Sequence, residues 1–193
     1  MSASPLSSLI ALLASRSAKR GDFVLASGRR SSLYVDCRLT AMGPEGQLLI
    51  GRVGLAALRH TGWSVDSVGG LTLGADPIAY AIAHASALAA EQGSGPMVRA
   101  FTVRKEAKHH GTGKLIEGPF ASGDRVVIVE DVITTGGSAL RAAEAVAAAG
   151  GTVLGVLALV DRQEGGREAL EAAGYPVIGL VTAADLLGQM PAA

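Results

Sequence analysis

Residues 126–138 read Val-Val-Ile-Val-Glu-Asp-Val-Ile-Thr-Thr-Gly-Gly-Ser, and the rest of the chain can be placed around them. The first four residues are β-branched, which is typical of a short strand that is buried on both faces in the middle of a parallel sheet. Two carboxylates and a turn of small residues follow. The Ala-rich residues 140–149 then predict a helix that ends at Gly150 and Gly151. The predicted order is strand, acidic pair, small-residue turn and helix.

The turn in this stretch suits a phosphate group. Glycine lets the backbone approach an anion, the hydroxyls of Thr134, Thr135 and Ser138 can donate hydrogen bonds, and the first N–H groups of a helix have no helical partner. Glu130 and Asp131 would repel a phosphate, so they need another task, such as accepting hydrogen bonds from sugar hydroxyls or holding a divalent metal. A phosphorylated sugar meets both requirements. The alternative is a pair of solvated loop charges before an ordinary strand-to-helix turn.

The composition indicates one globular domain with no strong net charge. The chain has 193 residues, of which 49% are hydrophobic, and 17 basic residues balance 17 acidic ones. A net charge of +0 gives no general attraction to nucleic acid or to an anionic membrane, so any anion site must be local. The single cysteine, Cys37, excludes an intramolecular disulfide and suits the reducing cytoplasm. No segment has the pattern of a signal peptide or a membrane span.

Alternating strands and helices predict an α/β fold with a mostly parallel central sheet flanked by helices. Strands are expected at residues 65–71, 97–103, 126–129, 152–160 and 175–182. Helices are expected at residues 47–60, 77–92, 140–149 and 183–187. Because ligands bind at the carboxyl ends of parallel strands, the loops after Val103, Val129 and Val160 should share one functional edge.

The N-terminal segment should form a small hood, from about residue 1 to about residue 40, beside a core that runs to residue 193. Leu6, Leu9, Ile10 and Leu13 recur at helical spacing, which predicts an amphipathic helix that ends near Gly21. Two short strands joined by a Ser-Gly turn are expected in residues 23–36.

A second unusual stretch, residues 104–114, reads Arg-Lys-Glu-Ala-Lys-His-His-Gly-Thr-Gly-Lys. Its four basic residues and one acidic residue give a local charge of about +3, and its composition predicts a loop. It is not a Walker A loop, because Lys108 stands where that motif has glycine and Leu115 replaces the metal-binding hydroxyl residue. No Cys or further His lies at ligand spacing from His109 and His110, which argues against a zinc site. A solvated basic loop is the remaining structural interpretation.

Together these stretches resemble the type I phosphoribosyltransferases. Residues 126–138 are similar to the family's motif for phosphoribosyl pyrophosphate (PRPP), and residues 23–36 and 104–111 are similar to signatures of the orotate phosphoribosyltransferases. The resemblance implies transfer of the 5-phosphoribosyl group from PRPP to orotate, which gives orotidine 5′-monophosphate and pyrophosphate in pyrimidine nucleotide synthesis. It also implies Mg²⁺ that is carried mainly by PRPP, with no metal ligands of the protein's own. The implied assembly is a homodimer whose catalytic loop reaches into the neighbouring subunit's site.

The resemblance also implies the site residues. Glu130 and Asp131 are the implied partners of the ribose 2- and 3-hydroxyls. The residues implied for catalysis and for pyrophosphate lie in the basic loop: Arg104, Lys105, Lys108 and His110. The rest of the implied PRPP site is Val132 and Ile133, followed by the cradle of the 5-phosphate: Thr134, Thr135, Gly136, Gly137 and Ser138. For orotate, the resemblance implies that Arg162 pairs with the carboxylate, with Thr134 beside it and Tyr34 as a wall of the base pocket. A surface ion pair for Arg162 and a packing role for Tyr34 are the structural alternatives.

Two positions depart from the pattern of some relatives, which have a lysine where this chain has Ala26 and another lysine in the loop at residues 73–76. Two other functions remain open. A phosphoribosyltransferase for another base would share residues 126–138, but it would not predict the basic loop. A PRPP-binding regulatory module of the same fold would be expected to have a degraded basic loop and a surface for nucleic acid.

Overall fold

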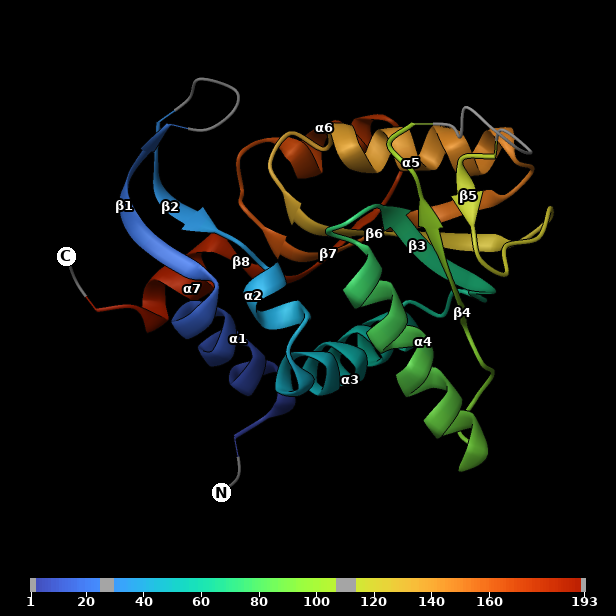
Figure 1. Cartoon of the computed structure of the whole chain (residues 1–193), viewed down its shortest axis with the longest axis horizontal. Coiled ribbons are helices and arrows are strands. Elements are labelled where there is room, and N and C mark those ends of the chain that lie inside the picture. Colours follow the sequence, from blue (N-terminus) through green and yellow to red (C-terminus); the bar gives the residue numbers. More distant parts are fainter. Residues whose placement is uncertain (1–2, 25–29, 107–113, 192–193) are drawn as a thin grey trace.

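The computed structural model describes residues 3–24, 30–106 and 114–191. Within these ranges, Figure 1 shows a twisted central sheet with helices on both faces and a smaller two-stranded sheet to one side. The central sheet has the strand order β5-β4-β3-β6-β7-β8. Its strands are β3 (Ser67–Leu71), β4 (Arg99–Val103), β5 (Ile116–Glu117), β6 (Arg125–Ile133), β7 (Thr152–Asp161) and β8 (Val177–Thr182). Every neighbouring pair is parallel except β4 with β5, which confirms the predicted fold class.

The helices form two layers, one on each face of the sheet. They are α1 (Pro5–Arg16), α2 (Arg38–Ala41), α3 (Pro44–His60), α4 (Asp76–Glu91), α5 (Gly137–Ala148), α6 (Gly166–Ala172) and α7 (Ala183–Gln189). Residues of α1, α3, α4 and α7 share one buried cluster with the sheet, and residues of α5 and α6 share the other. In the described part of the chain, no helix combines the length and apolar character that are needed to cross a membrane.

The side chains of β6 alternate between these two layers. Val127 and Val129 pack in the cluster with α3 and α4, whereas Val126 and Ile128 pack in the cluster with α5. All four side chains are fully buried. Successive strand residues point to opposite faces, so a strand covered by helices on both sides can hold an unbroken β-branched run.

Several predicted boundaries were wrong. Strand β6 does not end at Val129, because its pairing with β7 continues as far as Ile133. The acidic pair Glu130 and Asp131 therefore belongs to the strand and not to the turn after it. The first helix ends at Arg16 instead of near Gly21, because the next residues pair as a strand. Three short elements were missed, since each is too short to leave a periodic pattern in the sequence: α2, β5 and α6.

The two-stranded sheet is formed by β1 (Ala18–Val24) and β2 (Arg30–Val35), which pair in antiparallel fashion as predicted. The expected Ser-Gly turn, at residues 25–29, lies outside the described residues. Helix α1 packs against the core and not against the pair alone, because Leu9 and Leu13 are fully buried in the larger cluster. We use the word hood below for β1 and β2.

The direction in which the sheet is wound changes between β3 and β6. Strand β3 continues through α4 to β4, whereas β6 continues through α5 to β7, and these two helices belong to opposite layers (Figure 1). The two strands pair only where residues 67–69 meet residues 126–128, so they separate toward their carboxyl ends. Such a switch point is where open α/β sheets bind their ligands.

Candidate active site

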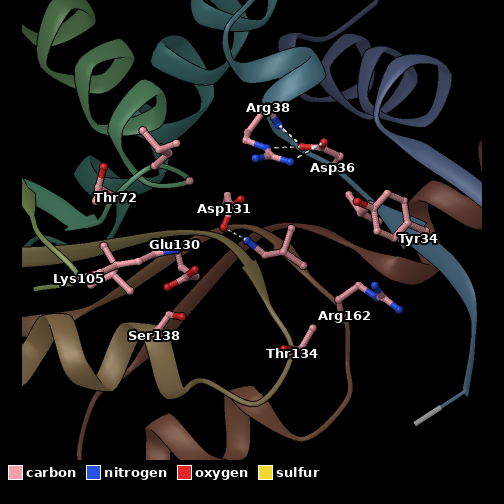
Figure 2. A pocket seen from close by; sticks show the side chains of 15 residues that line it. Tyr34, Asp36, Arg38, Thr72, Lys105, Glu130, Asp131, Thr134, Ser138 and Arg162 are labelled. Atoms are coloured by element: carbon pink, nitrogen blue, oxygen red, sulfur yellow. Dashed lines mark hydrogen bonds and ion pairs between the residues drawn. The ribbon is translucent and has the colours of Figure 1, made fainter. Parts of the chain in front are cut away.

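A cavity of about 390 Å³ lies at this switch point. It is lined from four directions: by strand β2, by the loop after β3, by the start of the basic loop after β4, and by the carboxyl ends of β6 and β7 (Figure 2). The predicted site residues that line it are Tyr34, Lys105, Glu130, Asp131, Val132, Thr134, Ser138 and Arg162. The structure thus brings together predicted site residues that lie far apart in the sequence.

A smaller hollow of about 40 Å³ lies in the turn between β6 and α5. Its lining is Glu130, Val132, Ile133, Thr134, Thr135, Gly136, Gly137 and Ser138, which includes the whole predicted phosphate cradle. The first N–H that bonds back along α5 is that of Leu140, to the carbonyl of Gly136. The N–H groups of the preceding residues are therefore left for an anion, at the positive end of the helix dipole.

Gly136 gives this turn its shape. Its φ of 81° lies in the left-handed region, and a Cβ atom at this position would lie 3.0 Å from the carbonyl oxygen of Gly166 and from Leu170 Cγ. Glycine is therefore required both for the backbone conformation and for the close approach of α6. Helix α6, which the sequence did not predict, supports the phosphate cradle from behind.

Glu130 and Asp131 leave β6 on opposite sides, as strand geometry requires (Figure 2). Glu130 is 9% exposed, and its Oε2 has no hydrogen-bond partner among the described residues. Burial, together with the neighbouring charge of Asp131, raises the pKa of Glu130 to about 9. Near neutral pH, Glu130 is therefore a carboxylic acid with one unsatisfied oxygen.

The Glu130 proton should make the stability of the free protein depend on pH. The folded state keeps this proton up to a pKa of about 9, whereas an ordinary glutamate has a pKa of 4.5. Between these values the folded state binds more protons, so the free energy of unfolding falls as pH rises. We expect Glu130→Gln to remove this part of the pH dependence, as measured by urea unfolding between about pH 6 and about pH 9.

The matched control for this prediction is Glu144→Gln, which changes an exposed glutamate on α5. We expect it to leave the pH dependence of unfolding as in the unmodified protein. The same slope in Glu130→Gln and in the unmodified protein would contradict a protonated Glu130.

Asp131 lies beside the loop that follows β3. Its Oδ1 accepts a hydrogen bond from the backbone N–H of Val132 at 2.9 Å. The loop can come this close because residue 74 is glycine: a Cβ atom there would lie 2.5 Å from the Asp131 carboxylate. Some relatives have a lysine in this loop. In this chain the loop has no such side chain, and the backbone of Gly74 lies against the carboxylate of Asp131.

The turn after β7 fixes the place of Arg162. The backbone N–H of Arg162 donates to the carbonyl of Ile133 at 3.0 Å, which ties the turn to the end of β6. Asp161 accepts from the backbone N–H of Gln163 at 2.8 Å and forms an ion pair with Arg167, also at 2.8 Å. These bonds hold the turn, and Arg162 lines the cavity.

The guanidinium of Arg162 is buried, with only 6% of the residue exposed. Its Nη2 donates to Ser31 Oγ in the hood at 2.6 Å and to Glu164 Oε1 at 2.8 Å. In the described part of the chain, its Nε has no hydrogen-bond partner. A planar donor with an unused N–H suits a carboxylate, and Tyr34 and Thr134 line the same cavity.

The basic loop is described only at its two ends. Lys105 lines the cavity. Arg104 is directed toward β5 instead, because its guanidinium lies 3.7 Å from a carboxylate oxygen of Glu117. Lys108 and His110 lie outside the described residues, so their roles stay predictions.

Three further polar residues of the cavity had no predicted role: Asp36, Arg38 and Thr72. Arg38 donates from Nε and Nη2 to the two carboxylate oxygens of Asp36, at 2.8 and 2.9 Å. This hydrogen bonding lowers the pKa of Asp36. The Asp-x-Arg spacing just after a predicted strand was the available signal for the pair.

Comparison with known proteins identifies the class. The family described as "Phosphoribosyl transferase domain" matches residues 58–173, a range that contains β3, β4, β6, β7 and the turn with the phosphate cradle. The fold and the site thus define a phosphoribosyltransferase.

The relatives narrow this class to one branch. An orotate phosphoribosyltransferase of Rhodopirellula baltica is 46% identical over 184 residues, which cover 93% of each chain. A crystal structure of the Mycobacterium tuberculosis orotate phosphoribosyltransferase has a TM-score of 0.80 and 43% identity, and covers 95% of this chain and 99% of its own. That enzyme in complex with PRPP gives a TM-score of 0.74 with 38% identity, over 96% and 93% of the two chains. The chain belongs to the orotate phosphoribosyltransferase family, which confirms the resemblance and the predicted activity.

Proposed function

We propose that the switch-point cavity binds PRPP and orotate and forms orotidine 5′-monophosphate and pyrophosphate, a step of pyrimidine nucleotide synthesis. The observation that carries this proposal is the buried guanidinium of Arg162, which shares one cavity with the phosphate cradle. Orotate has a carboxylate for this guanidinium, whereas adenine, guanine and uracil have none. A buried donor without a partner disfavours these other bases.

The cavity suggests an arrangement for both substrates. The 5-phosphate would lie in the hollow at the N-terminus of α5, and the ribose hydroxyls would meet Glu130 and Asp131. A protonated Glu130 can donate a hydrogen bond to a sugar oxygen, while Asp131 accepts one. Pyrophosphate would then face the loop after β3 and Lys105, and orotate would lie between Arg162 and Tyr34.

The reaction breaks the bond between C1 of the ribose and a pyrophosphate oxygen, whose electron pair leaves with pyrophosphate. A ring nitrogen of orotate forms the new bond to C1 and loses its proton, which the leaving pyrophosphate can accept. In the transition state C1 becomes more positive and the leaving group more negative, so the protein contributes position and electrostatics. We assign neutralisation of the leaving group to the basic loop: Arg104, Lys105, Lys108 and His110. Closure of this loop would exclude water, which could otherwise attack C1.

Magnesium fits this site as part of the PRPP complex. Among the described residues, no group of three or more His, Cys, Asp or Glu could hold a metal ion. Burial disfavours the charged form of Glu130 and Asp36 is bonded to Arg38, so of the three carboxylates that line the cavity Asp131 is the one that would face the metal. Mg²⁺ prefers several oxygen ligands, and the others would come from PRPP. When bound, the metal would help to neutralise the pyrophosphate charge.

We also propose that residues 1–193 act as one domain in the cytoplasm, and that the hood belongs to an N-terminal part of this domain, from about residue 1 to about residue 40. The packing of α1 into the main core cluster supports one domain. The cysteine Cys37 is free and buried, which suits a reducing compartment.

A homodimer with a shared catalytic loop is supported by exposed apolar side chains on helices that contact one another, which we call the apolar patch. They lie on α2 and its C-cap, on α3 and α4 and in the loop after β3, and they are 47% to 62% exposed: Leu39, Met42, Leu48, Leu73, Tyr80 and Leu88. Leu73 also lines the active-site cavity, so the patch reaches the edge of the site. A second copy that covered the patch would bury apolar surface and stand next to the cavity.

Sedimentation tests this assembly. We expect a particle of twice the 19.4 kDa chain mass, and we expect Leu48→Glu to shift it toward the monomer, because a charge would be buried in the interface. The control is Glu168→Lys, which changes an exposed residue on α6, away from the patch. A monomer in the unmodified protein would contradict the shared site.

The activity itself is tested with purified protein, PRPP, magnesium and a panel of bases, by following orotate absorbance. We expect orotate to be consumed. Consumption of adenine, guanine or uracil, with orotate left unconsumed, would contradict orotate as the substrate. Binding of PRPP without consumption of any base would favour a regulatory module.

A further inference from the structure

Asp76, the first residue of α4, holds two separate segments with its two carboxylate oxygens. Its Oδ2 accepts a hydrogen bond from Thr72 Oγ1 at 2.7 Å, in the loop after β3. Its Oδ1 accepts a hydrogen bond from Thr102 Oγ1 at 2.8 Å, on β4. Thr72 lines the active-site cavity (Figure 2), and β4 leads directly to Lys105, which lines it too. One carboxylate thus connects two walls of the site.

The same two segments are also joined by their backbones. The N–H of Thr72 donates to the carbonyl of Val103 at 2.9 Å, so the loop starts in register with the end of β4. The hydroxyl of Tyr80 lies 3.0 Å from Thr102 Oγ1 and completes the network on its exposed side. Asp76 is the member of this network that contacts both segments through its side chain.

The loop after β3 has no cationic side chain of its own, since residues 71–75 read Leu-Thr-Leu-Gly-Ala. Its contribution to an anion must therefore come from its backbone, because the hydroxyl of Thr72 already donates to Asp76, and this contribution depends on where the backbone is placed. The loop is fixed on one side by the contact of Gly74 with Asp131, and on the other side by the bond of Thr72 to Asp76.

A carboxylate this close to a site for pyrophosphate has an electrostatic cost, because like charges repel. A simple structural explanation is that an acidic residue in the first turn of a helix interacts well with the helix dipole. A carboxylate that faced solvent would interact with the helix dipole equally well. The two carboxylate oxygens of Asp76 instead accept hydrogen bonds from hydroxyls of two different segments. Asp76 therefore fixes how these segments lie relative to each other, in addition to placing a charge near the helix N-terminus.

We propose that Asp76 is a positioning residue for the pyrophosphate group of PRPP. It holds the loop after β3 in a fixed place relative to the strand that carries Lys105. This inference rests on the proposed function. Asp76 acts through Thr72 and through β4, and it does not contact the substrate itself. Misplacement of such a wall by about 1 Å can lower a reaction rate on the order of 100-fold.

Three variants test the proposal by steady-state kinetics. Asp76→Ala should raise the KM for PRPP about tenfold or more and lower kcat, with the KM for orotate changed less than about twofold. Asp76→Asn should keep most of the activity that Asp76→Ala loses, because the asparagine amide can form hydrogen bonds with both threonine hydroxyls once these hydroxyls rotate. Glu91→Gln is the matched control, since it neutralises an exposed carboxylate at the other end of α4 and should change neither KM by more than about twofold.

Titration calorimetry with pyrophosphate alone gives a readout that does not need turnover. We expect Asp76→Ala to weaken pyrophosphate binding and Asp76→Asn to bind it nearly as well as the unmodified protein. Equal increases in both KM values, no rescue by Asp76→Asn, or unchanged kinetics in Asp76→Ala would each overturn the proposal. Failure of the unmodified protein to consume orotate would instead contradict the proposed function.

Discussion

Replacing Arg162 with alanine should raise the KM for orotate about 100-fold, while the KM for PRPP changes less than about threefold. The effect should be large because the guanidinium is buried and keeps one N–H without a partner among the described residues. Loss of one member of a buried charge pair leaves the other unpaired, at a cost of about 2 to 5 kcal/mol. Steady-state kinetics with each substrate varied in turn measure the two KM values.

The variant Arg162→Lys separates charge from shape at this position. Lysine keeps the positive charge but loses the planar fork, so we expect a KM for orotate between those of the unmodified protein and the alanine variant. Thermal unfolding should accompany both measurements, because Arg162 also contacts Ser31 in the hood. A selective loss of PRPP affinity would show that Arg162 belongs to the other substrate.

Replacing Lys108 with alanine should lower kcat about 100- to 1000-fold, which is typical when one group that stabilises developing charge is removed. The residue lies in the basic stretch after β4, outside the described residues, and Lys105 at the start of that stretch already lines the cavity. The melting temperature should stay close to that of the unmodified protein, because the substitution removes a charged side chain from a polar stretch of the sequence. Single-turnover kinetics and thermal unfolding measure the two quantities.

The control for Lys108 is its neighbour His109. We assigned no role to His109, and His109→Ala should keep kcat within about threefold of the unmodified value. An unchanged kcat in Lys108→Ala would remove that residue from the mechanism. A similar loss in both variants would indicate that the whole loop, and not one cation, limits the rate.

The parts of the site that could be predicted are those encoded by neighbouring residues. The β-branched run at residues 126–129 identified the central strand, and the Thr-Thr-Gly-Gly-Ser turn identified the phosphate cradle, because both signals are local. Arg162 was chosen differently, because its Asp-Arg pair resembles that of the orotate phosphoribosyltransferases, and the position after a strand only agreed with this choice.

The parts that could not be predicted depend on contacts between distant segments. The acidic pair was expected in a loop, but pairing with β7 extends β6 beyond it and buries Glu130. The protonated state of Glu130 follows from that burial. The role of Asp76 depends on Thr102, which lies on another strand. The local sequence pattern shows neither the pairing of Glu130 with β7 nor the bond between Asp76 and Thr102.

The two sides of the cavity differ in how they are built, and this has a consequence for protein engineering. The side that we propose for the sugar phosphate stands on β6, whose first valines and isoleucine are fully buried between two helical layers. The base side is closed by an antiparallel pair at the margin, where Tyr34 is 41% exposed. Core positions tolerate few changes, whereas exposed positions tolerate many. Libraries that aim at a new acceptor base should therefore vary β1 and β2, and leave the strand under the ribose unchanged.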